Sequence, residues 1–431
     1  MTTRRQFLAG LGTAAVGSLA GCGALDGSYG NSEDPLEKAD FEGWTPATLV
    51  EPSALPFELP ETLFGSLEGR TRDLLTAVPE DPAIPNATIR QEIRADRSHV
   101  QKRIEDGVDA DTAMGRLKRL HGNLRDAAEL FGSYRAASGQ NDGAIVADRR
   151  ERIREDLAIF ESSMDYAAPS TLEAVLVYAP VEDRLERAKH ELPPREPYPD
   201  DPVANVEQAG RAYQGVESAA AALEAARGIR TAQHSDLEIA ESRWSELATA
   251  TRWLDISVGR TRSSRVPYPE TADSADVFEF ELSGVKQEVY RFARRDTQHT
   301  IDSFNEAVDT NRFGTAAVLA GQSLASIAAF EGVITAIRQG TLADEPSVES
   351  VRTAADGAHE TLQEIPMGEY PFLSAAIGQP AVFEYRSGVR SAGEELFDPD
   401  YAEASFRHAG LLGAATNEAA AFVVEQLEGH P

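Results

Sequence analysis

The sequence is short of basic residues, and this shortage argues against one class of function. Its 431 residues hold 41 Lys and Arg against 71 Asp and Glu, which gives a formal net charge of −30. A protein that binds nucleic acid needs a basic face to neutralise phosphates. We therefore expect no nucleic-acid partner. Only five of the 41 basic residues are lysine, so arginine is strongly preferred.

Cysteine is scarcer still, because the chain has one, Cys22. A single Cys cannot form a disulfide framework or a metal site built from several thiolates. Hydrophobic residues nevertheless make up 42 % of the chain, and at this length they can bury a large core. We therefore expect a globular body that folds without disulfides.

The motifs of the commonest enzyme classes are missing as well. The sequence has no G-x-S-x-G, no H-E-x-x-H, no G-x-x-x-x-G-K-[ST] and no G-x-G-x-x-G after a strand. We therefore expect no cofactor, and a non-enzymatic role is favoured.

The N-terminus carries the clearest motif that is present. Arg4 and Arg5 precede a short apolar run rich in Gly and Ala, which is too short to span a membrane. A basic start, a short apolar core and small residues make a signal peptide, and paired arginines indicate twin-arginine export. The run ends in Leu19-Ala20-Gly21-Cys22, which resembles a lipobox. The pattern predicts a signal peptide over residues 1–21 and lipidation of Cys22.

The composition also indicates the salt conditions to which the chain is adapted. In molar salt the Debye length falls to ~3 Å, so the repulsion within a chain of this charge is mostly screened. Scarce lysine, preferred arginine and acids spread along the chain are typical of halophilic proteins. Together with residues 1–22, the chain resembles the twin-arginine-exported lipoproteins of haloarchaea. The resemblance implies an exported protein held on the outer face of the cell membrane by lipidated Cys22. It implies no particular activity.

Helical periodicity dominates after residue 60. Ile89, Ile93, Val100 and Ile104, for example, lie on one helical stripe. The pattern predicts an all-α fold, a multi-helix bundle or an irregular array of helical hairpins, with about a dozen helices. Residues 277–282 alone alternate like a strand. No segment after residue 22 is expected to span a membrane.

Stretches rich in polar residues, glycine and proline indicate where the domains begin and end. Residues 22–60 hold many polar residues and helix breakers, which predicts a lipid-anchored flexible tether. Five prolines between Leu192 and Pro202 interrupt the helical pattern. We therefore expect an N-terminal helical sub-bundle over 61–192 and a C-terminal one over 203–431.

A short motif, R-x-P-Y-P-[DE], occurs twice, beginning at Arg195 and at Arg265. In one interpretation each copy is a stiff corner whose tyrosine, Tyr198 or Tyr268, closes the end of a bundle. In the other, the two arginines and two tyrosines form a recognition surface on one rim.

Two D-x-x-H pairs are the strongest metal candidates. Asp296 and His299, and likewise Asp356 and His359, share a helix face at a spacing of i and i+3. Bundles that bind two metal ions use related E-x-x-H pairs, but Asp has the shorter reach. With so many acids in the chain, such pairs also arise by chance. We therefore expect no metal, and keep these four residues as the alternative.

Asn86-Ala87-Thr88 is an N-glycosylation sequon that directly precedes a predicted helix. Asn86 is either a glycosylation acceptor or the N-cap of that helix. The two alternatives stay open at this point.

These observations favour a membrane-anchored, extracytoplasmic helical protein that binds or scaffolds a partner protein at the cell surface. The alternative is a metal-binding bundle, or a metal-dependent enzyme, that uses the two D-x-x-H pairs. The sequence does not identify a ligand.

Overall fold

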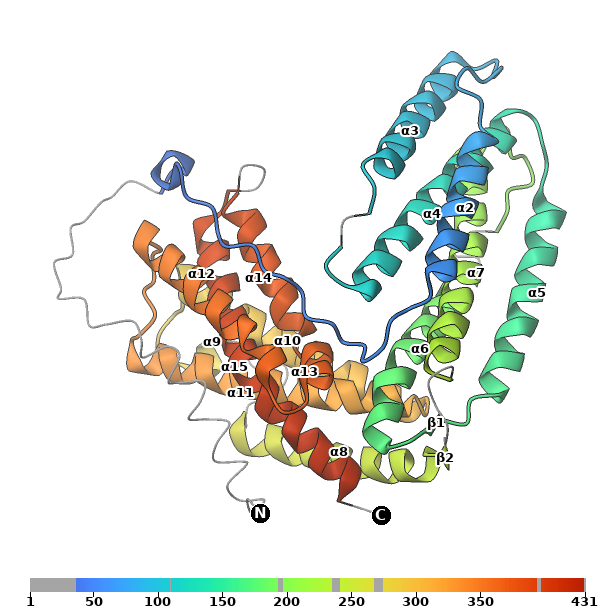
Figure 1. Ribbon diagram of the computed structural model, residues 1–431. Coiled ribbons are helices and arrows are strands. Elements are labelled where there is room, and N and C mark those ends of the chain that lie inside the picture. Colours follow the sequence, from blue (N-terminus) through green and yellow to red (C-terminus); the bar gives the residue numbers. More distant parts are fainter. Residues whose placement is uncertain are drawn as a thin grey trace. The chain divides into compact units, whose positions relative to one another are not determined.

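The computed structural model describes residues 36–108, 110–192, 197–234, 241–266, 274–393 and 397–429. These residues form fourteen α-helices, two short 3₁₀ helices and one antiparallel pair of two-residue strands. The predicted all-α fold is confirmed (Figure 1). The predicted export and lipidation residues, Arg4, Arg5 and Cys22, lie outside the described residues, as do Arg195 and Tyr268.

The chain divides into two compact units. The N-terminal unit is Leu55–Trp244, and the C-terminal unit comprises Ser245–Pro431 together with the segment up to Ala54. The boundary therefore falls at Trp244 and not at the proline-rich stretch 192–202. Prolines do end the helix before that stretch, but the next helix, α7 (Val206–His234), packs against the preceding helices and belongs with them.

In the N-terminal unit, α7 packs against α4 (Ala113–Ala137) and α6 (Thr171–Glu191). Helix α4 also packs against α2 (Glu61–Thr76) and α3 (Ala87–Glu105). The core holds Leu67, Leu124, Val181 and Ile229, all fully buried. Small residues let α4 and α7 approach closely, because a Cβ atom on Gly210 would lie 2.8 Å from the backbone oxygen of Glu129. The other elements of the unit are α5 (Gly143–Ser162), β1 (Ala167–Ala168) and β2 (Glu241–Ser242).

The C-terminal unit is built around α11 (Phe313–Gln339) and α15 (Pro399–Glu428), which pack against each other. Helix α10 (Gly284–Asp309) packs against both, while α12 (Val348–Gln363) and α14 (Gln379–Ser391) pack against α15. The smaller and peripheral elements are α8 (Trp244–Arg265), α9 (Ser274–Val277), η2 (Ile365–Met367) and α13 (Pro371–Ile377).

Helix α11 is apolar on all sides, as a central core helix is. It is long and apolar enough to cross a membrane, and 78 % of its most apolar stretch is buried inside the fold. This corrects the expectation that no segment after residue 22 has that length and composition. The core helix of a helical bundle is buried in the same way.

Residues 277–282, whose sequence alternates like a strand, form no strand in the structure. Helix α9 ends at Val277, and residues 278–282 follow without regular structure. Phe278 is buried against Tyr290, with ring centroids 5.6 Å apart, while Phe280 is half exposed. The alternation therefore reflects aromatic packing and not the pairing of strands.

Residues 36–54, which we call the strap, dock onto the C-terminal unit. They begin with a 3₁₀ helix, η1 (Lys38–Phe41), and Figure 1 shows the strap in blue alongside α14. Phe41 is buried edge-on against Phe397, and the Tyr385 hydroxyl donates a 2.8 Å hydrogen bond to the backbone oxygen of Ala47. A flexible tether was expected over 22–60, and for its described part that expectation is wrong. A few apolar side chains are enough to fix an extended segment.

Candidate functional site

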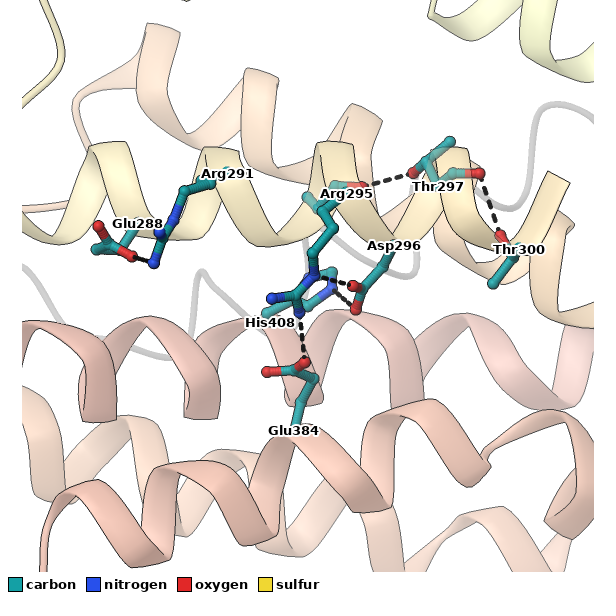
Figure 2. A network of polar contacts seen from close by, with 9 residues as sticks. Glu288, Arg291, Arg295, Asp296, Thr297, Thr300, Glu384 and His408 are labelled. Carbon is teal, nitrogen blue, oxygen red and sulfur yellow. Dashed lines mark hydrogen bonds and ion pairs between the residues drawn. The ribbon is translucent and has the colours of Figure 1, made fainter. Parts of the chain in front are cut away.

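Four polar side chains meet between α10, α14 and α15. The Oδ2 atom of Asp296 lies 3.0 Å from the Nε2 atom of His408. The other carboxylate oxygen of Asp296 accepts a 2.9 Å bond from the guanidinium of Arg295, which also donates a 2.9 Å bond to Glu384. Figure 2 shows the four side chains, with Arg295 between the two carboxylates. We call Arg295, Asp296, Glu384 and His408 the polar cluster.

Three helices bring these residues together: α10 supplies Arg295 and Asp296, α14 supplies Glu384 and α15 supplies His408. The buried positions of α10 include Phe292, Ala293 and Thr297, which flank Asp296. His408 lies on the buried face of α15 and has an exposed fraction of 0 %. The Arg295 side chain, in contrast, is 52 % exposed, so the cluster contacts solvent on that side.

The pKa values of the two carboxyl groups in the cluster are shifted in opposite directions. Burial works against ionisation of Asp296, but hydrogen bonds and charge from His408 and Arg295 outweigh it and hold its pKa below the usual value. Burial raises the pKa of Glu384, and the charge of Asp296 adds to the rise. Asp296 is therefore ionised at lower pH than an ordinary Asp, whereas Glu384 loses its proton only at higher pH than an ordinary Glu.

Two buried atoms of the cluster have no hydrogen-bond partner among the described residues, namely His408 Nδ1 and Glu384 Oε2. Such atoms cost free energy when they are buried. In a Ser-His-Asp triad the carboxylate contacts Nδ1 of the histidine and leaves Nε2 to act as the base, whereas Asp296 contacts Nε2 of His408. In addition, His408 is fully buried, so a substrate cannot contact it in this conformation. The cluster holds charge inside the unit and is not an open active site.

The sequence did not identify most of this cluster. Neither His408, which is fully buried, nor Arg295 and Glu384 belong to a motif that the sequence analysis identifies. A usable signal was present in the neighbours of His408, since Ala404, Phe406 and Ala409 are apolar and buried.

The structure does not join the D-x-x-H pairs into a metal centre. Asp296 contacts His408, whereas His299 is exposed. Asp356 is also exposed, and His359 Nε2 lies 3.3 Å from the backbone oxygen of Thr48 in the strap. Among the described residues no group of three or more His, Cys, Asp or Glu side chains has the arrangement of a metal site.

The described residues of the two R-x-P-Y-P-[DE] motifs have structural contacts. The Tyr198 hydroxyl accepts a 3.2 Å bond from the backbone N–H of Asp142 in the N-terminal unit. Arg265 forms a 2.8 Å ion pair with Glu331 in the C-terminal unit, and its side chain is 6 % exposed. Both contacts favour the interpretation of stiff corners over that of a recognition surface.

Asn86 is the N-cap of α3. Its side-chain oxygen accepts bonds from the backbone N–H groups of Thr88, at 3.0 Å, and Ile89, at 3.3 Å. The N-cap interpretation is therefore confirmed. The Asn86 side chain is exposed, and glycosylation there stays a prediction.

Comparison with known families follows the division into units. Residues 63–239 match a family model described as a domain of unknown function (DUF8262), and residues 244–425 match another described as a domain of unknown function (DUF8264). No curated protein and no solved structure matches the chain. The junction between the two matches coincides with the boundary between the units at Trp244. The chain thus combines two regions, each similar to a different family of unknown function and each corresponding to one structural unit.

Proposed function

We propose that this protein is an exported lipoprotein that holds a helical binding or scaffold module on the outer face of the cell membrane. Lipidated Cys22 is the anchor. The module binds a partner protein at the cell surface and carries out no chemistry of its own.

The signal-like residues 1–21 and the lipobox that ends in Cys22 support the anchor, and the docked strap indicates which unit the anchor would hold. Thirteen residues, 23–35, separate Cys22 from Leu36, where the described chain begins. Even fully extended, a linker of that length spans at most ~50 Å. The strap then packs onto α12 and α14 through Tyr385 and His359, and Arg386 forms a 2.7 Å ion pair with Glu51. An anchor at Cys22 would therefore hold the C-terminal unit near the membrane.

A non-enzymatic role is supported by the burial of two members of the polar cluster. His408 and Glu384 have acid–base side chains, and both are buried. In addition, the sequence lacks the common catalytic motifs. Both observations favour recognition over catalysis.

The test is fractionation of cells that express Cys22→Ser, with Ser28→Ala as a control in the segment that follows the lipobox. Wild type and the control are expected in the membrane fraction and should need detergent for release. The Cys22→Ser protein is expected in the medium, because an acyl-type anchor contributes ~0.8 kcal/mol per buried methylene and nothing replaces it. Membrane retention of Cys22→Ser would overturn the proposal.

Export is tested separately by replacing Arg4 and Arg5 with lysine. The twin-arginine route reads the arginines themselves and not the charge, so the double variant is expected to accumulate inside the cell. Normal export of the variant would mean that another route carries the protein.

A further inference from the structure

One face of α14 is exposed and carries aromatic and basic side chains but no acid. Phe383, Arg386 and Arg390 follow one another at spacings of three and four residues, so they share that face, and all three are exposed. The only acid in the sequence of α14, Glu384, is buried in the polar cluster. The exposed face of this helix is therefore basic and aromatic in a chain whose net charge is −30.

The ion pairs in this region leave the arginines at the surface and cover the acids. Arg386 pairs with Glu51 of the strap at 2.7 Å, and the exposed fractions of the two side chains are 48 % and 17 %. Arg295, which is also half exposed, pairs with the largely buried Glu384 and Asp296 (Figure 2). Although these charges compensate one another, the guanidinium groups are the parts that solvent contacts. A surface that approaches this face meets positive charge first.

Exposed apolar side chains accompany the arginines. Phe383 is 61 % exposed and Val50 of the strap is 70 % exposed. Val50 is next in sequence to Glu51, which pairs with Arg386, and the strap runs alongside α14 (Figure 1). Single apolar side chains are common on protein surfaces, but apolar groups together with exposed arginines make a surface amphipathic. We call Val50, Phe383, Arg386 and Arg390 the α14 patch.

The strap also relates this patch to the proposed anchor. Thirteen residues separate Cys22 from the start of the described chain, and a linker of that length spans at most ~50 Å. The strap begins at the end of this linker and contacts α14 through Arg386 and Tyr385. An anchor at Cys22 would therefore keep the α14 patch close to the lipid surface, at a high local concentration.

We propose that the α14 patch is a membrane-contact surface, which binds anionic phosphate headgroups while Phe383 enters the interface between headgroups and acyl chains. A guanidinium pairs with a phosphate through two parallel N–H groups, and an aromatic side chain is favourable at that interface. The inference rests on the proposed function, because a contact of this size is weak and reversible without an anchor. The anchor supplies most of the binding, and the patch determines which face of the C-terminal unit meets the membrane.

The test uses the mature chain, residues 22–431, with Cys22→Ser, so that neither lipid nor signal peptide contributes to binding. In about 2 M KCl, where only direct contacts between charges escape screening, the chain is mixed with vesicles and bound protein is measured by sedimentation. The chain is expected to bind phosphatidylglycerol vesicles at millimolar lipid, and to bind them more tightly than phosphatidylcholine vesicles, which carry no net charge.

Phe383→Ala is expected to weaken this binding about fivefold or more, because it removes the largest apolar group that enters the interface. Arg390→Gln is expected to weaken it about twofold or more and to reduce the preference for phosphatidylglycerol. Both side chains are exposed, so the thermal midpoint should not change. Ile159→Ala and Arg119→Gln replace exposed residues of the N-terminal unit, and these matched controls should bind as the parent chain does.

Two results would overturn the inference. One is a parent chain that does not bind phosphatidylglycerol vesicles, or binds them no better than phosphatidylcholine vesicles. The other is that Phe383→Ala and Arg390→Gln both bind as the parent chain does, since another surface would then make the contact. Neither result bears on the anchor, because contact through the patch alone is lost when cell membranes are washed, whereas a lipidated chain needs detergent for release. Wild type that washes off cell membranes, together with vesicle binding through the patch, would overturn the anchor alone.

Discussion

At the scale of single residues, the buried contact between His408 and Asp296 is expected to stabilise the C-terminal unit. His408→Leu keeps the apolar volume but removes the 3.0 Å contact to Asp296, whose side chain is 14 % exposed. A buried carboxylate that loses a partner destabilises a fold by ~3–5 kcal/mol, and Arg295 retains part of the interaction. We therefore expect a loss of ~2–4 kcal/mol in the free energy of unfolding, measured by urea titration in molar KCl.

His299→Leu is the control for this prediction, because His299 is exposed on α10, the helix that carries Asp296. Its effect should stay within ~0.5 kcal/mol. Equal effects of the two variants would mean that the Asp296–His408 contact does not stabilise the unit.

The two carboxyls of the polar cluster predict a pH dependence of stability. The folded-state pKa of Glu384 is raised above its ordinary value of 4.5, so the folded chain holds this proton to higher pH than the unfolded chain does. The contribution of Glu384 to stability is therefore full below pH 4.5 and decreases as the pH rises through the raised pKa. Glu384→Gln removes this decrease.

The stability difference between Glu384→Gln and wild type should accordingly shift in favour of the variant from pH 4 to pH 7. Asp296, whose folded-state pKa is lowered, contributes the opposite dependence at lower pH and is present in both chains. Urea titrations across this range give the difference, with the exposed Glu360→Gln as control. A difference that is constant with pH would contradict the assignment.

The sequence pointed to Asp296 but not to its partner. Spacing along a helix identifies neighbours such as His299, whereas the residue that contacts Asp296 is 112 positions away. Such a contact depends on how α10 and α15 pack, and periodicity within either helix does not contain that information. Asn86 is the opposite case, because an N-cap is a local interaction and could be predicted from three adjacent residues.

At the scale of elements, the strap makes the most direct prediction. Phe41→Ala removes an aromatic side chain that is buried against Phe397 and lies 5.8 Å from the ring of Trp44. The strap should then detach locally while the helices stay folded. Limited proteolysis should cut within residues 36–54 at about tenfold or more the wild-type rate.

Val50→Ala is the control, because Val50 belongs to the strap but is 70 % exposed. Its cleavage rate should match that of wild type. If Phe41→Ala were cut no faster than the control, the packing of Phe41 would not be what holds the strap.

Helices were more predictable than the segments between them. The stripe from Ile89 to Ile104 lies within α3. It follows from periodicity, which is set by local geometry. The strap has no helical period, and contacts with distant residues such as Tyr385, Arg386 and Phe397 fix it, so its polar composition suggested a linker.

At the scale of the whole molecule, the net charge of −30 predicts a dependence on salt. At 0.01 M salt the Debye length is ~30 Å, so acids across a unit repel one another. Dialysis from molar to low KCl should therefore unfold the chain, measured as loss of the helical circular-dichroism signal, and restored salt should bring it back. A helical signal unchanged at low salt would contradict the halophilic interpretation.

The number of units was predictable, but their boundary was not. Helix α6 ends at Glu191, before the stretch that holds five prolines, yet α7 still packs against α4 and α6. The cause lies in α7, where Ala219, Ala222 and Ala226 are fully buried and permit close helix contacts. Alanine-rich helices give a weak periodic signal, so the sequence does not show which neighbours they contact.

The central claim is that Cys22 anchors the chain to the membrane, and the mass of the N-terminal peptide tests it most directly. Protein extracted with detergent from membranes in molar salt is digested, and its first peptide is measured by mass spectrometry. The account predicts that residues 1–21 are absent and that the peptide starting at Cys22 carries the added mass of lipid. A first peptide that retains residues 1–21, or that begins at an unmodified Cys22, would contradict it.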